Sequence, residues 1–99
     1  MKKKYAFMIM GENYNPQENT AYFTTGNLMT MIVTVRNLDE ACEKVQELLD
    51  EGVGALELCG AIGEAGAQRL MELTGHKLPI GYVVHKPEQD ELFNQFFGG

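Results

Sequence analysis

The amino-acid sequence predicts an α/β fold: a small, four-stranded, mainly parallel sheet with β-α-β-α-β crossovers and a short C-terminal helix. Two observations predict this fold. Beyond residue 27, apolar runs of strand length alternate with helical patterns, which is the order of a parallel sheet with right-handed crossovers. The runs Tyr5–Met10 and Leu28–Val35 are also almost continuously apolar, as expected of parallel strands covered on both faces. The alternative is a ferredoxin-like α+β sandwich, but the sequence lacks the strand-to-strand step in mid-chain that this fold requires.

The N-terminal part predicts two strands separated by a long polar connection. The strand Tyr5–Met10 stops at Gly11, and the segment Gly11–Asn27 that follows is rich in amides and acids. Within it, Tyr22–Thr25 is a candidate for a short antiparallel edge strand, followed by a hairpin-type Gly-Asn pair. Connections of this length are uncommon and often functional.

The clearest helix begins after Asn37 and ends before Gly52. Asn37 is a suitable N-cap with Glu40 three positions on, and glycine is typical just past a helix C-terminus. Apolar side chains recur at helical spacing, so we expect burial of Leu38, Val45, Leu48 and Leu49, with Cys42 in the core.

The C-terminal half predicts two further strands and two helices. Val53–Cys59 and Lys77–Val84 are the strands, and a helix from about residue 61 to 74 joins them. Pro87 precedes a short amphipathic helix, Glu88–Phe97, with acids in its first turn. The apolar face of this helix, which includes Phe96 and Phe97, either closes the core or joins a second subunit.

Length and charge exclude several functional classes. Ninety-nine residues make one domain, and a formal net charge of -6 does not favour binding to nucleic acid or to an anionic membrane. No apolar run approaches the roughly 20 residues of a membrane span, and no export signal is evident. Two cysteines without disulfide or metal-ligand spacing indicate a cytoplasmic protein with neither a metal site nor a cofactor.

The candidate ligand site lies where the parallel strands end. Their carboxyl ends share one edge of the sheet, which is where open α/β sheets bind ligands. Polar residues in the turns at this edge are candidates to bind a ligand: Glu12, Asn13, Tyr14, Arg36 and Gly60. Polar turns are also ordinary at strand ends, so position alone does not establish a site.

Three residues at or near this edge are candidates for catalysis. Cys59 precedes a helix, a position that favours a reactive thiolate, and His85 on the next strand end is its candidate base. The competing interpretation of Cys59 is a buried core cysteine. Glu57 lies between two leucines, so we expect it to face a covered side of the sheet and to pair with a donor such as Arg36 or to have a raised pKa.

Two stretches carry a resemblance to known families. Val35–Ala41 and Glu51–Gly60 resemble a β-α-β unit of (β/α)₈ barrels of the keto-deoxy-phosphogluconate aldolase type, in which the glutamate matching Glu57 is a general base. The arginine that follows it in that family falls at about Ala61, and its Schiff-base lysine lies on a later strand that this chain lacks, so the aldolase reaction is not implied. End to end, the chain resembles a family of small bacterial proteins of unknown function.

Three functional hypotheses follow. The first is a small cytosolic homodimer that binds a small molecule at the carboxyl edge of the sheet. The second is an enzyme that uses Glu57 or Cys59 on an acid or carbonyl substrate. The third is a structural or interaction subunit of a larger assembly. In the first two, we expect the long connection Gly11–Asn27 to act as a lid over the ligand; the competing interpretation is a surface connection that only carries the chain back to the second strand.

Overall fold

The computed structural model describes residues 2–98 and contains one five-stranded sheet in the order β2-β3-β1-β4-β5. The strands are β1 (Lys3–Met10), β2 (Ala21–Thr25), β3 (Leu28–Val35), β4 (Ala55–Leu58) and β5 (Ile80–Tyr82). β3, β1, β4 and β5 pair in parallel, whereas β2 pairs antiparallel with β3. The mainly parallel α/β fold is therefore confirmed, and the strand count is corrected from four to five because the candidate edge strand is formed.

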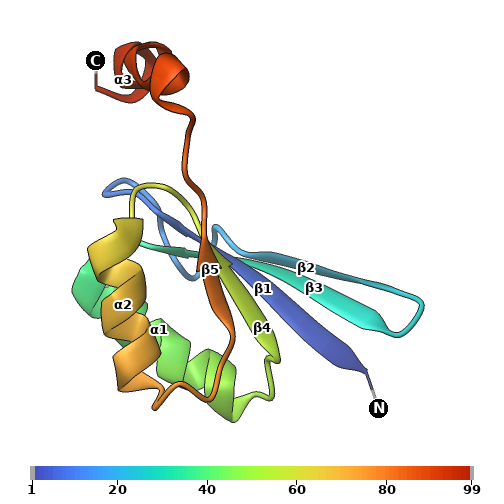
Figure 1. Ribbon diagram of the computed structural model, residues 1–99. Helices are drawn as coiled ribbons and strands as arrows, with labels where there is room; N and C mark the ends of the chain where they lie inside the picture. The colour runs from blue at the N-terminus through green and yellow to red at the C-terminus, as the bar shows by residue number, and fades with distance from the viewer. Residues whose placement is uncertain (1, 99) are drawn as a thin grey trace.

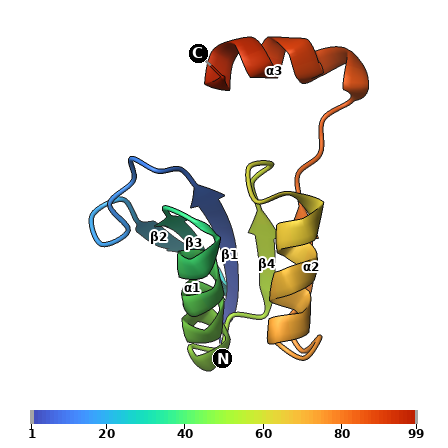
Figure 2. The ribbon, with the colours of Figure 1, turned by 90° about the vertical axis from the view of Figure 1, so that its left-hand side faces the viewer.

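Two long helices cover one face of this sheet. These helices, α1 (Leu38–Asp50) and α2 (Gly63–Leu73), lie on the same side of the strands (Figure 1; Figure 2). The crossovers from β3 to β4 and from β4 to β5 step across the sheet in one direction, and right-handed crossovers of this kind place their helices on one face. The expectation that the parallel strands are covered on both faces is wrong: in the part of the chain that the structure describes, no helix lies on the second face of the sheet.

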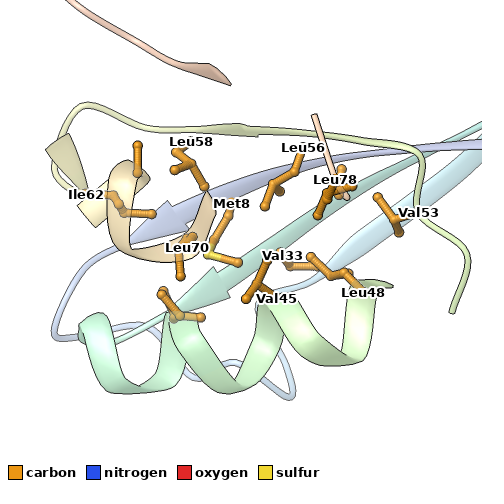
Figure 3. Packing of buried hydrophobic residues seen from close by; sticks show 14 residues of the cluster. Met8, Val33, Val45, Leu48, Val53, Leu56, Leu58, Ile62, Leu70 and Leu78 are labelled. Carbon is orange, nitrogen blue, oxygen red and sulfur yellow. The ribbon is translucent and has the colours of Figure 1, made fainter. Parts of the chain in front are cut away.

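The core lies between these helices and the covered face of the sheet (Figure 3). Met8, Leu56 and Leu58 project from the strands and pack with Leu70 of α2 and Leu48 of α1, all of them fully buried. Alternation along each strand places their neighbours on the open face.

The predicted burial along α1 is confirmed in its middle and wrong at its start. Val45 and Leu48 are buried, and Leu49 is partly buried against the core. Leu38 is 38% exposed, because it occupies the first position of the helix, at the margin of the core. Cys42 also packs against the core from a partly exposed position.

The predicted ends of α1 are confirmed. The Asn37 side-chain oxygen accepts a hydrogen bond from the Glu40 backbone N–H at 2.9 Å, which satisfies one of the unpaired donors of the first turn. After the last turn, Gly52 adopts a positive φ of 88°, a conformation that glycine reaches without steric cost.

The C-terminal helix stands apart from the rest of the molecule. A short 3₁₀ turn, η1 (Pro87–Gln89), precedes α3 (Asp90–Phe97), and an extended segment carries both away from β5 (Figure 1; Figure 2). No residue of α3 is buried, and Phe96 and Phe97 are 79% and 75% exposed. The helix therefore does not close the core of its own chain. Within residues 2–98, no helix combines the length and apolar character needed to cross a membrane.

Candidate functional site

A cavity of about 690 Å³ opens at the carboxyl edge of the sheet. It lies where β1 and β4 end and where the chain leaves β5, and α3 borders it from the outside. Six of the sequence-predicted site residues line it: Glu12, Asn13, Tyr14, Cys59, Gly60 and His85. Parallel pairing brings these residues together, because it places the ends of β1, β4 and β5 side by side.

The remaining walls of this cavity are apolar. Ile9 and Met10 come from the end of β1, Ala61 from the turn before α2, and Phe93 and Phe97 from α3. None of these residues was predicted from the sequence to belong to the site. The apolar face of the C-terminal helix was the available signal, but it pointed equally to a core or to a subunit interface.

The Cys59 thiol is held at the end of β1 by the backbone. The Met10 N–H donates a hydrogen bond to Cys59 Sγ at 3.3 Å, and the Cys59 N–H donates to the Met8 carbonyl at 3.0 Å. Because of these two hydrogen bonds, the sulfur has a defined position on the cavity wall. Cys59 is partly exposed and forms no disulfide.

The His85 imidazole stacks on the Phe93 ring of α3. The ring centroids are 3.6 Å apart and the planes differ by 14°. The Nδ1 atom lies 3.9 Å from a carboxylate oxygen of Asp90, which exceeds hydrogen-bond distance. On the other side, the imidazole lies close to Gly60, where an added Cβ atom would be in van der Waals contact with Nε2 at 3.8 Å. His85 thus joins the strand end to α3.

The connection that begins at Gly11 runs along the same edge and is fixed by its own hydrogen bonds. The Gly11 N–H donates to the Val35 carbonyl at 3.0 Å, and the Tyr14 N–H donates to the Gly11 carbonyl at 3.2 Å. Further along, the Thr34 hydroxyl donates to the Asn19 carbonyl at 2.8 Å. Asn13 and Tyr14 consequently border the same cavity as Cys59 and His85, as the lid hypothesis requires.

Arg36 lies outside this cavity, in a second and more polar hollow of about 540 Å³ beside α1. Its guanidinium forms hydrogen bonds to Glu40, and its backbone N–H donates to the same carboxylate at 2.8 Å. These bonds hold the pKa of Glu40 below its ordinary value. Tyr14 borders both hollows.

Glu57 lies on the open face of the sheet and is exposed, which corrects the expectation that it faces a covered side. Its carboxylate accepts a hydrogen bond from the Tyr5 hydroxyl at 2.7 Å, so its donor is Tyr5 and not Arg36. Burial of the Tyr5 phenol and then this hydrogen bond raise the pKa of Tyr5 to about 12. Glu57 projects from the face of the sheet opposite the helix-covered core, and it does not line the cavity that holds Cys59.

In residues 2–98, no cluster of three or more His, Cys, Asp or Glu side chains is arranged to hold a metal ion. The polar groups at the margins of the apolar cavity surface are a thiol, an imidazole, an amide, a phenol and a carboxylate.

Comparison with protein families matches residues 3–98 to the sequence profile described as "Family of unknown function (DUF6506)". Neither the curated proteins nor the solved structures include a significant match.

Proposed function

Because the chain belongs to this family of unknown function, DUF6506, we propose a function from its own cavity: it binds a small, largely apolar molecule at the carboxyl edge of the sheet. The observation that carries the proposal is the composition of the cavity wall. Apolar side chains from β1 and α3 form most of its surface, and a few polar groups converge on it from the turns. Ligand sites of small molecules are built in this way, with volumes of about 300–1,000 Å³.

The stacked pair of His85 and Phe93 suggests the shape and polarity of the ligand. We expect a flat apolar group to lie against Met10 and Phe97. A carbonyl or carboxyl oxygen on this group would accept a hydrogen bond from the His85 imidazole. We therefore propose a planar ring compound with a single acid or carbonyl group. The two free cysteines are compatible with a reducing compartment, so we place the protein in the cytoplasm.

A titration followed by ¹H–¹⁵N NMR tests this proposal. The probes are 2-naphthoate and 2-naphthamide, and the expected result is that amide signals of Met10, Asn13, Gly60 and Ala61 shift together. Ala61→Trp fills the cavity and should abolish the shifts. Ala65→Trp is the matched control, since Ala65 is exposed on α2 outside the cavity and should leave binding unchanged. Shifts that persist in Ala61→Trp, or are absent with both probes, would contradict the proposal.

The role of His85 is tested separately with the same probes. His85→Phe keeps an aromatic ring against Phe93 and removes both ring nitrogens. We expect this variant to bind the apolar ring still but to lose any preference for 2-naphthoate over 2-naphthamide. An unchanged preference would remove His85 from the polar part of the site.

A second candidate function is catalysis by Cys59 on a carbonyl substrate. The observation that favours it is that Cys59 and His85 line one cavity, whereas Glu57 does not. The test is alkylation by iodoacetamide, followed by mass spectrometry, with Cys42 as the internal reference because it is also free and partly exposed. A catalytic thiol should react at least about tenfold faster than Cys42 and slow in His85→Phe. Equal rates would contradict a catalytic role.

A further inference from the structure

Two apolar surfaces of this chain are left uncovered. One is on α3, where Leu92, Phe96 and Phe97 are mostly exposed. The other is the open face of the sheet, where Phe23 is 53% exposed and Leu28 and Ile32 are more than one-third exposed. Apolar surfaces of this extent on a small domain mark interaction sites.

The open face continues across the middle of the sheet. The register pairs Phe7 of β1 with Ile32 of β3, and Ile32 with Ala21 of β2, so these side chains project to the same side. Phe7 and Ile9 are partly exposed there, and Tyr5 is held by Glu57 beside them. A flat row of aromatic and β-branched side chains is the surface on which helices pack in α/β proteins, as α1 and α2 do on the opposite face.

We propose that α3 of one copy packs on the open sheet face of a second copy and that the second copy reciprocates, so that the protein is a two-fold symmetric dimer. Both complementary surfaces belong to the same chain, and a two-fold axis satisfies both at once with a single type of contact. The extended segment before η1 carries α3 beyond the carboxyl edge of its own sheet, where it is free to contact a second copy (Figure 2).

The exposed area is sufficient for such a dimer. Taking about 200 Å² for a large apolar side chain, the exposed fractions of Leu92, Phe96 and Phe97 amount to about 430 Å² on α3. Phe23, Leu28 and Ile32 contribute about 250 Å² more on the sheet face. The two together approach the roughly 800 Å² per partner of a standard stable interface.

The charges also suit this arrangement. Glu88, Asp90 and Glu91 precede or open α3, and no base follows Lys86 in the chain. The amino edge of the sheet carries Lys2, Lys3 and Lys4, and alternation places Lys3 on the open face. A two-fold axis perpendicular to the strands brings the carboxyl edge of one sheet over the amino edge of the other. The acidic start of each α3 then lies near Lys3 of the second copy, and attraction between unlike charges orients the pair.

This inference does not depend on whether the cavity binds a ligand. It does involve the same helix, because Phe93 and Phe97 line the cavity while Leu92 and Phe96 do not. Variants at Phe96 therefore test the dimer without removing a cavity wall.

Sedimentation equilibrium of the full chain is the first test. We expect a dimer at micromolar concentration, with a dissociation constant that Phe96→Ser and Phe23→Ser each raise at least about tenfold. Tyr22→Ser is the matched control: Tyr22 adjoins Phe23 in β2 and is 71% exposed, but it projects to the opposite face and should leave the constant unchanged. Circular dichroism of each variant verifies that it folds.

A cross-linking experiment is the second test and does not rely on loss of association. Chains carrying Phe23→Cys are mixed with chains carrying Phe96→Cys, with both native cysteines replaced by alanine. The proposal expects a disulfide-linked heterodimer under mild oxidation, and a mixture with Tyr22→Cys in place of Phe23→Cys should give none. A monomer at about 100 micromolar, the upper working concentration, would overturn the proposal. So would equal effects of the Tyr22 and Phe23 variants on the dissociation constant, or an effect of the Phe96 variants alone.

Discussion

Truncation of Leu48 is the most direct test of where the core lies. Leu48→Ala removes three carbon atoms from a side chain that is 1% exposed between α1 and the sheet. At about 0.8 kcal/mol per buried methylene, the lost transfer free energy is about 2.4 kcal/mol. A cavity that only partly collapses adds to this, so we expect the free energy of unfolding to fall by about 3–4 kcal/mol, within the 2–5 kcal/mol seen for such substitutions.

Urea denaturation followed by circular dichroism measures this loss, with all variants at one protein concentration so that association contributes equally. In a domain of this size a loss of about 3 kcal/mol lowers the melting temperature by roughly 10–25 °C. Leu38→Ala is the matched control on the same helix, and we expect it to cost about 1 kcal/mol because Leu38 is already 38% exposed. A loss within about 0.5 kcal/mol for Leu48→Ala, or equal losses for both variants, would refute this account of the core.

Three further predictions concern a cap, a titration and a close contact. Asn37→Ala should reduce the free energy of unfolding by about 1 kcal/mol because it removes the bond to the first turn of α1, and Asn37→Asp should restore most of it; thermal melts would show whether it does. NMR titration of Tyr5 should give a pKa of about 12, and Glu57→Gln should lower it. Because the folded state favours the neutral phenol, the contribution of Tyr5 to the free energy of unfolding is fully present below pH 10 and is lost as the pH rises from about 10 to about 12. A free energy of unfolding that stays constant across this range would contradict the hydrogen bond between Tyr5 and Glu57. Gly66→Ala places a Cβ atom 2.7 Å from the Ile62 side chain, so we expect urea denaturation to show a net loss of about 1–2 kcal/mol despite the better helix propensity of alanine.

Local features of this fold were predictable because they depend on short stretches of sequence. The cap at Asn37 and the glycine stop at Gly52 are set by residues within one turn of each helix end, and the structure confirms both. The convergence of Cys59 and His85 on one cavity followed from parallel pairing alone, because strand ends at one edge are near one another whatever covers the faces.

The side of the sheet that each residue faces was less predictable. Tyr5, Phe7 and Ile9 are apolar like their buried neighbours in β1, so the strand had the composition of one covered on both faces. The structure of one chain leaves that second face open, and Glu57 with it. Which faces a pair of crossover helices covers depends on strand order, and a single sequence does not specify strand order. An apolar face that only a second copy covers has the same sequence pattern as one covered by the chain itself.

Tyr14 is the partition between two compartments of different character. Its ring borders the apolar cavity of Cys59 on one side and the charged hollow of Arg36 on the other. The ring lies directly against Gly11, where a Cβ atom would come within 2.8 Å of it, so the absence of a side chain at Gly11 is what lets the ring occupy this place. Any displacement of this one ring therefore alters the wall of both hollows at once. A side chain at Gly11 would force such a displacement, so a single small residue in the turn after β1 maintains the boundary between an apolar and a charged compartment.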